Sequence, residues 1–297
     1  MNVIHSIVGW YPIKYILPLA LHPFVRIVDP KSNNFLKDKI YVIFYITGYG
    51  FVVAYYALKL YFSMETANLV QIVIPRIIYS IALSMVVYCF FVKKTVILSE
   101  NKIRLIWEIM ELPMFLIMGE KNLLTMLIMK VVYQLFFTLM KETGSGDHPY
   151  SSVLLANLGA FFYFATGHGN QTSTIQMDKG FIGMEKGSIY ISFILIVFNT
   201  LYSHICSIFC FMILFVQSTT REYFGGNFPR ESRKYRKLRS SVNYVIHFLG
   251  SIMFTAINCL YNFESLLLLY DFAPKYFMEV MIVPTLCLMI LCFYIFF

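Results

Sequence analysis

The sequence predicts an all-α fold, a polytopic bundle of transmembrane helices with about nine spans (about 8 to 10). Hydrophobic residues make up 59% of the 297 residues and charged residues only 13%, and the mean hydropathy is +0.68. A soluble protein of this composition would lack the polar groups needed to cover its surface. Residues 188–217 form a run of 30 residues without a formal charge, although about 20 apolar residues already cross the hydrocarbon core.

The candidate spans follow one another along the whole chain. Residues 103–118 are the weakest of them, because they contain Arg104, Glu108, Glu111 and Pro113, and the alternative is a helix at the membrane interface. No internal repeat or long linker interrupts the pattern, so we expect a single transmembrane domain over residues 1–297. The spans are expected at residues 3–24, 40–59, 68–92, 103–118, 122–140, 151–166, 188–217, 242–263 and 277–297.

A basic loop fixes the expected orientation. Residues 221–239 carry seven Lys and Arg side chains between two apolar segments, and such loops stay in the cytoplasm. Counting spans backward places the loops near residues 26–39, 93–104 and 141–150 on the same side, and the first two of them are basic. The less basic loops on the other side include residues 167–187. The net charge of +8 is therefore explained by membrane topology, and no nucleic-acid partner is indicated.

Several polar or small residues lie inside the predicted spans. Arg76 and Lys130 are intramembrane charges, which are functional candidates unless they snorkel to an interface. Glu108 and Glu111 share a helix face and could act as a general acid and base, or Glu108 could pair with Arg104. We expect Asn199 and His204 to bridge helices by hydrogen bonds, and Gly48 and Gly50 to permit close helix packing. All six cysteines lie in apolar stretches and indicate no disulfide or zinc site, so we expect them to act as small packing residues.

The most distinctive loop is residues 164–187, FATGHGNQTSTIQMDKGFIGMEKG. It is polar, it lies between two spans, and topology places it outside the cytoplasm. It contains the polar side chains His168, Asn170, Thr172 and Thr174, which are candidate contacts for a lipid headgroup. For His168 the alternative is a local hydrogen bond to the backbone, and residues 170–172 also form an Asn-x-Thr glycosylation pattern.

This loop resembles the membrane region of the ethanolamine phosphate transferases of glycosylphosphatidylinositol (GPI) anchor synthesis that act on the second and third mannoses. The resemblance lies in Phe-Ala-Thr-Gly-His at residues 164–168 and in Gly-Phe-Ile-Gly at residues 180–183. A second match is Phe-Ala-Pro-Lys at residues 272–275, followed by Glu279. The chain departs from the family at Glu264 and Ser265, where the family has a basic Arg-His pair.

The resemblance implies a multi-pass module of the endoplasmic reticulum membrane that holds a lipid-linked glycan and phosphatidylethanolamine at the lumenal leaflet. It adds Lys275 and Glu279 to the contact candidates and implies two kinds of partner, membrane lipids and a small hydrophobic subunit of the GPI pathway. The family's catalytic domain, with its divalent metal, zinc, and its Thr nucleophile, has no counterpart in these 297 residues. We therefore expect no catalytic residue, metal ligand or cofactor in this chain.

Two alternatives stay open from the sequence. The chain is either a truncated form of such a transferase or a stand-alone module. A transporter or a non-catalytic membrane scaffold is the competing class, favoured by Arg76, Lys130 and the number of spans. The absence of an internal repeat in the sequence weighs against a transporter, because many secondary transporters contain one.

Overall fold

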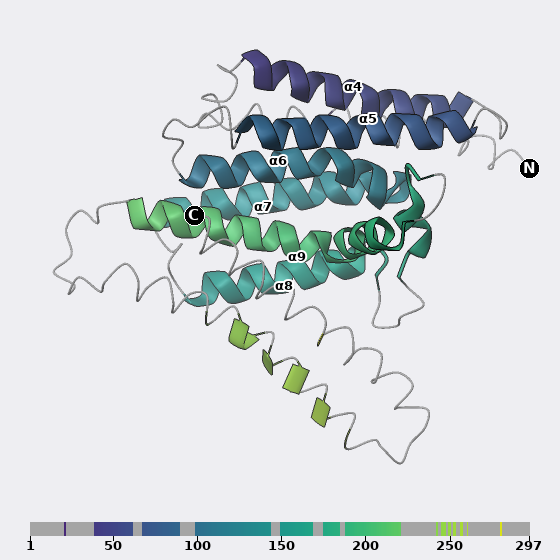
Figure 1. The fold of residues 1–297 in the computed structure, drawn as a ribbon. Coiled ribbons are helices and arrows are strands. Elements are labelled where there is room, and N and C mark those ends of the chain that lie inside the picture. The colour runs from purple at the N-terminus through teal and green to yellow at the C-terminus, as the bar shows by residue number, and fades with distance from the viewer. Residues whose placement is uncertain are drawn as a thin grey trace, which may run out of the picture. The chain divides into compact units, whose positions relative to one another are not determined.

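A computed structural model describes most of the central part of the chain. The described residues are 21, 39–61, 67–89, 99–143, 149–168, 175–184 and 188–220, with isolated positions between 242 and 280. All regular elements within them are helical, which confirms the all-α prediction for this part of the chain (Figure 1). The elements are α4 (Lys39–Tyr61), α5 (Ala67–Val87), α6 (Ser99–Met118), η2 (Glu120–Asn122), α7 (Leu123–Thr143), α8 (Pro149–Ala165), η4 (Met177–Phe181) and α9 (Ile189–Thr220).

Four helical segments in the described part are long and apolar enough to cross a membrane. They are Ile40–Lys59, Val70–Val87, Glu120–Met140 and Ile189–Leu214, and they correspond to the predicted spans 40–59, 68–92, 122–140 and 188–217. The span predicted at 151–166 is the shorter apolar helix Tyr150–Ala165, and residues 103–118 form most of α6 without joining the four. The predictions at 3–24, 242–263 and 277–297 lie outside the described residues apart from isolated positions, so the count of nine stays a prediction.

The chain divides into two compact units, and α6, α7 and α9 contribute residues to both of them. Unit 1 comprises Met1–Ile97, Leu105–Val132 and Met177–Asn199, and unit 2 comprises Leu98–Arg104, Tyr133–Gln176 and Thr200–Phe297.

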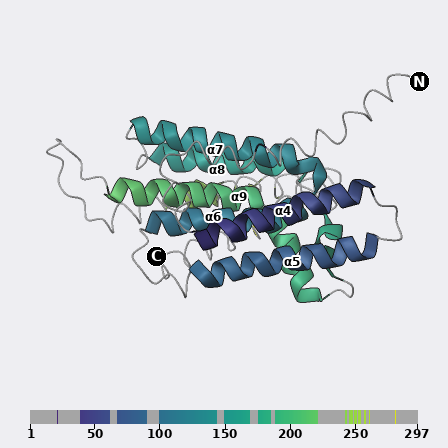
Figure 2. The ribbon, with the colours of Figure 1, turned by 90° about the horizontal axis from the view of Figure 1, so that it is seen from above.

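In unit 1, α4 and α5 lie side by side (Figures 1 and 2). Gly48 of α4 permits close packing, because a Cβ there would lie 2.9 Å from Leu112 Cδ1 and 3.4 Å from Ile81 Cγ2. A Cβ at Gly50 would meet nothing within 4 Å, so the predicted packing role holds for the first glycine and not for the second. The Tyr49 ring packs edge-on against Phe115 of α6, with centroids 5.5 Å apart. Tight glycine and aromatic contacts thus hold three helices of this unit together.

In unit 2, small and polar side chains join α7, α8 and α9. The Tyr133 hydroxyl donates to the Ser203 carbonyl at 3.2 Å, and the Ser207 hydroxyl donates to the Leu155 carbonyl at 2.6 Å. A Cβ at Gly159 would lie 3.0 Å from His204 Nδ1 and 3.1 Å from Ser207 Cβ. Close approach at a glycine together with hydrogen bonds between helices is typical of packing in membranes, where the hydrophobic effect does not drive helices together.

Candidate lipid-contact site

A proline in α5 creates the point at which residues 180–183 of the polar loop are attached. Pro75 has no N–H group, so the Gln71 carbonyl four residues earlier loses its usual helical donor. The backbone N–H of Gly183 donates to that carbonyl at 3.1 Å. In a membrane helix, a carbonyl freed by proline has to be satisfied by a neighbouring group. The turn at residues 180–183, which we call the docking turn, therefore completes the hydrogen bonding of α5.

Two side chains of α5 bind the same docking turn. Arg76 Nε donates to the Gly183 carbonyl at 2.8 Å, and the Tyr79 hydroxyl donates to the Ile182 carbonyl at 3.4 Å. Together with the Gly183 N–H bond, they connect α5 to residues more than 100 positions later in the sequence.

Steric contacts explain why both Gly180 and Gly183 of the docking turn are glycines. Gly183 adopts a φ of +84°, which disfavours side chains, and a Cβ there would lie 3.1 Å from Pro75 Cβ. A Cβ at Gly180 would lie 2.9 Å from Ile196 Cδ1 and 3.0 Å from the Ser192 carbonyl oxygen in the first turns of α9. The Gly-Phe-Ile-Gly pattern is thus explained by contacts with two helices of unit 1.

The Nε atom of Arg76 is held by a hydrogen bond, and the terminal nitrogens of its guanidinium are not held by any carboxylate of the described residues. Its residue surface is exposed, and its Nε is held by the docking turn. No carboxylate of the described residues forms an ion pair with its guanidinium. Among the described residues, the terminal nitrogens of the fork therefore have no anionic partner.

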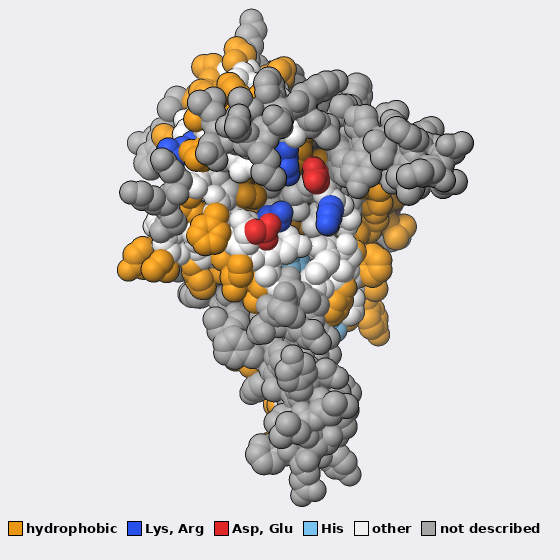
Figure 3. All heavy atoms as spheres, turned by 90° about the vertical axis from the view of Figure 1, so that its right-hand side faces the viewer, with side chains coloured by type: hydrophobic (Ala, Val, Ile, Leu, Met, Phe, Trp, Pro, Cys, Tyr) orange, Lys and Arg blue, Asp and Glu red, His pale blue; other side chains and the backbone are white. Residues whose placement is uncertain are grey.

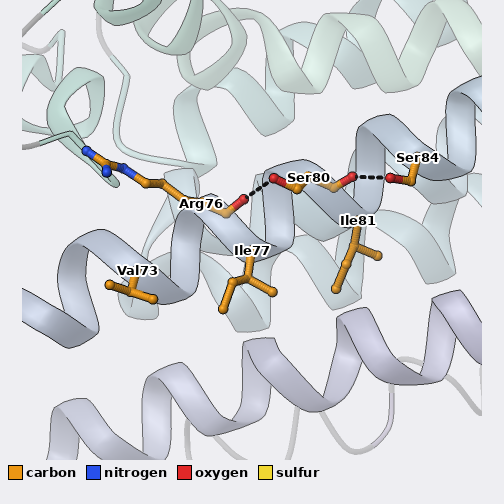
Figure 4. Close-up of a pocket in the computed structure, with 6 residues that line it drawn as sticks. All are labelled: Val73, Arg76, Ile77, Ser80, Ile81 and Ser84. Carbon is orange, nitrogen blue, oxygen red and sulfur yellow. Dashed lines mark hydrogen bonds between the residues drawn. The ribbon is translucent and has the colours of Figure 1, made fainter.

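A hollow of about 420 Å³ follows one face of α5 beside Arg76 (Figure 4). Its lining residues recur every three or four positions, so they share one side of the helix. The Ser80 hydroxyl donates to the Arg76 carbonyl and the Ser84 hydroxyl to the Ser80 carbonyl, both at 2.8 Å. The hollow is lined by Val73, Arg76, Ile77, Ser80, Ile81 and Ser84.

Acidic and basic side chains gather on one face of the molecule (Figure 3). In unit 1, Lys59 at the end of α4 lies 3.9 Å from Glu120 of η2, and Lys179 lies 3.1 Å from Asp178 in η4. A Cβ at Gly119 would lie 3.1 Å from Lys179 Nζ, so η2 and η4 approach each other at this residue. We call Lys59, Glu120, Asp178 and Lys179 the charged rim, which offers groups of both signs to a ligand.

The second intramembrane charge, Lys130, is paired inside unit 1. Its Nζ lies 2.7 Å from Glu111 Oε2, and the two side chains are 14% and 3% exposed. Lys130 thus faces packed protein, as expected for a charge in a span. The neighbouring carboxylate Glu108 accepts a hydrogen bond from the Tyr41 hydroxyl at 3.0 Å. The two carboxylates considered as an acid and base pair therefore have separate partners.

In unit 2, the residues that follow α8 form a helix cap. Gly167 has a φ of +88°, and its N–H donates to the Phe164 carbonyl at 3.0 Å. The His168 N–H donates to the Tyr163 carbonyl at 3.3 Å, which completes a Schellman motif. The Thr166 hydroxyl lies 2.9 Å from the Phe162 and Tyr163 carbonyls. The Thr-Gly-His part of the loop motif thus has a local structural explanation.

The His168 side chain is buried and not presented to solvent. It is 3% exposed, and its ring stacks on Tyr163 with centroids 5.3 Å apart. His204 of α9 lies against the same tyrosine ring, with centroids 5.6 Å apart. Two residues that were predicted to have separate roles therefore contact one ring. The other predicted contact residues, Asn170, Thr172, Thr174, Lys275 and Glu279, lie outside the described residues.

The cysteines of the described helices, Cys89, Cys206 and Cys210, are buried, in agreement with a packing role. Within the described residues, no three His, Cys, Asp or Glu side chains gather where they could hold a metal ion. No family model, no curated protein and no solved structure matches this chain.

Proposed function

We propose that the chain is the membrane module of a GPI-anchor ethanolamine phosphate transferase. In this role it holds a lipid-linked glycan and phosphatidylethanolamine at the lumenal leaflet of the endoplasmic reticulum membrane. The observation that carries the proposal is the docking turn, because the residues that resemble the family are attached to a membrane helix by Gly183, Arg76 and Tyr79. A loop fixed in this way is a suitable platform for positioning a lipid substrate.

The chemistry of the charged rim fits the headgroups involved. Phosphatidylethanolamine carries an ammonium group and a phosphate, and the rim offers two carboxylates and two ammonium groups. Glu120 and Asp178 would attract the ethanolamine ammonium, whereas Lys59 and Lys179 would attract phosphate. In this proposal the chain binds and orients substrates, and the family resemblance assigns the metal-dependent transfer itself to a separate domain.

The proposal includes a small hydrophobic partner subunit within the membrane. Large apolar side chains at the start of α9 are exposed, with Ile189 and Tyr190 both at 83%. Part of this surface can face lipid, and part can face another helix. Association with the subunit is the component of the proposal that does not require substrate binding.

One observation favours a transporter as the second candidate function. The buried Lys130–Glu111 pair lies between α6 and α7, and charges inside a membrane often mark ion or proton pathways. The pair also has a sufficient structural role, because each charge satisfies the other. Solute uptake by proteoliposomes is the measurement that separates these two roles.

The test of the proposed function uses the purified full chain in nanodiscs that contain phosphatidylethanolamine and a photoactivatable GPI precursor. We expect capture of the precursor, no phosphoethanolamine transfer by the chain alone, and co-purification of the small subunit in mild detergent. Replacing residues 170–174 with Gly and Ser, which leaves the buried His168 in place, should lower capture by about tenfold, or about 1.4 kcal/mol. The matched control replaces Asp147 and His148, in a loop predicted to be cytoplasmic, with Gly and Ser.

Equal capture by the loop variant and the control variant would contradict the proposed role of the loop. Phosphoethanolamine transfer by the isolated chain would contradict the non-catalytic role. Solute uptake without capture of the precursor would favour the transporter.

A further inference from the structure

We propose that the hollow on α5 binds one glycerophospholipid molecule. The Arg76 guanidinium binds the lipid phosphate, and one acyl chain lies along Val73, Ile77 and Ile81 (Figure 4). This inference goes beyond the proposed function and does not depend on it, because it concerns the lipid-binding chemistry of a single helix face.

The cation of this site is preorganised for a phosphate. The hydrogen bond from Nε to the Gly183 carbonyl at 2.8 Å restrains the long Arg76 side chain. The terminal nitrogens still offer N–H groups in a planar fork, which matches two phosphate oxygens. No carboxylate of the described residues pairs with this guanidinium, so the described part of the chain supplies no counterion for its positive charge. A phosphate is the anion that lipids supply at the membrane surface.

The position of Arg76 along α5 agrees with a headgroup contact. Arg76 lies six residues after Val70, where the apolar span begins, a distance of about 9 Å along the helix axis. Its side chain extends toward the Val73 end of α5 and the docking turn (Figure 4). An arginine that extends this way brings its charge toward the interface while its stem stays among apolar groups. A lipid phosphate at that level would neutralise the charge.

The rest of the hollow suits an acyl chain. Val73, Ile77 and Ile81 form an apolar row at intervals of four residues, and they point the same way (Figure 4). Ser80 and Ser84 are small, and their hydroxyl hydrogens already bond to backbone carbonyls. From Val73 to Ser84 the lining spans about 16 Å, roughly half of the 30 Å hydrocarbon core. That length corresponds to one leaflet.

Charge complementarity selects a phospholipid over other occupants. Inorganic phosphate would leave the apolar row unused, and a diacylglycerol would leave Arg76 without an anion. A second copy of the chain would have to supply a carboxylate at the same depth. Only a lipid with a phosphodiester headgroup satisfies both the cation and the apolar row.

The experiment reconstitutes the full chain in phosphatidylcholine nanodiscs with a trace of phosphatidylcholine that carries a photoreactive acyl chain. Labelled peptides are identified by mass spectrometry. We expect labelling within residues 73–84, lowered about tenfold in Arg76→Gln because a charge-assisted contact is lost. Arg76→Lys keeps the charge without the fork and should lower labelling by an intermediate amount.

Ser80→Leu fills the hollow and should abolish labelling. Its matched control is Thr138→Leu on α7, because the exposed Thr138 hydroxyl likewise donates to a carbonyl four residues earlier, at 2.9 Å. The control should label as the wild type does. Thermal unfolding of each variant in the same nanodiscs separates loss of lipid binding from loss of folding, and only variants that unfold as the wild type does are compared.

Four results would overturn the proposal. One is equal labelling of residues 73–84 in the wild type and Arg76→Gln. Another is equal labelling by a photoreactive diacylglycerol, which lacks phosphate. The third is crosslinking of two protein chains through this face, which would show that a second copy occupies it. Excess inorganic phosphate should not compete, and competition would show that a free anion is the ligand. Loss of GPI-precursor capture without a change in this labelling would leave the lipid site intact and contradict only the proposed function.

Discussion

Removing one partner of the Lys130–Glu111 ion pair should destabilise the protein far more than removing both. The two charged atoms lie 2.7 Å apart, and Glu111 is the more deeply buried partner, at 3% exposure against 14% for Lys130. Lys130→Met leaves a buried carboxylate without its cation. We expect a loss of about 3–5 kcal/mol in the free energy of unfolding.

The double variant reveals whether the charges themselves are needed. Glu111→Leu should cost less than Lys130→Met, because the remaining lysine can extend its ammonium group toward solvent or headgroups. With both changes present, apolar side chains fill the space and the stability should return to within about 1 kcal/mol of the wild type. The coupling free energy of the double-mutant cycle should therefore be about 3 kcal/mol.

The assay is reversible unfolding of the full chain by SDS in mixed micelles, followed by tryptophan fluorescence. The Lys59–Glu120 pair is the internal control, because its atoms lie 3.9 Å apart and its side chains are 42% and 33% exposed. Its coupling should be only about 0.2–1 kcal/mol. Additive effects at Lys130 and Glu111, or couplings of equal size in the two pairs, would refute the argument from burial.

Two glycine substitutions test the close contacts. Gly183→Ala should lower the free energy of unfolding by about 1–2 kcal/mol through its positive φ alone, and the contact with Pro75 should lower it further. The control Gly50→Ala, on the open side of α4, should not lower it measurably. Equal effects of the two changes in the same SDS titration would contradict the docking of the turn. Gly159→Leu should cost about 1–3 kcal/mol by forcing α8 away from His204, and an unchanged unfolding midpoint would show that these helices are not in close contact.

The long apolar helices could be predicted because their composition alone determines them. The spans predicted at 40–59, 122–140 and 188–217 match apolar helices to within a few residues. Residues 103–118 were harder to predict as a span, because the charged residues of α6 reduce its mean hydropathy. The structure accounts for these charges through partners on other helices, including Tyr41 for Glu108 and Lys130 for Glu111. Such pairings depend on tertiary packing, so the sequence pattern could not reveal them.

The candidate site was only partly predictable. The loop motif was visible as a sequence feature, but its division into a helix cap at Gly167 and a docking turn at Gly183 was not. A glycine after an apolar helix is a recognised capping signal, so the first part was accessible in principle. The link between Pro75 and Gly183 spans more than 100 residues. The sequence feature that points to this link is Pro75 within an apolar span, because a proline predicts an unsatisfied carbonyl four residues earlier. It does not indicate which group donates to that carbonyl.

The orientation of the docking turn in the membrane is the most direct test of the account. Single cysteines replace Asp178, whose side chain is 71% exposed, and Ser232 in the basic loop, in a background with the six native cysteines changed to alanine. Sealed microsomes are treated from the cytoplasmic side with a membrane-impermeant maleimide. We predict labelling at position 232 in intact vesicles, and at position 178 only after permeabilisation. Labelling of position 178 in intact vesicles, or protection of position 232, would contradict it.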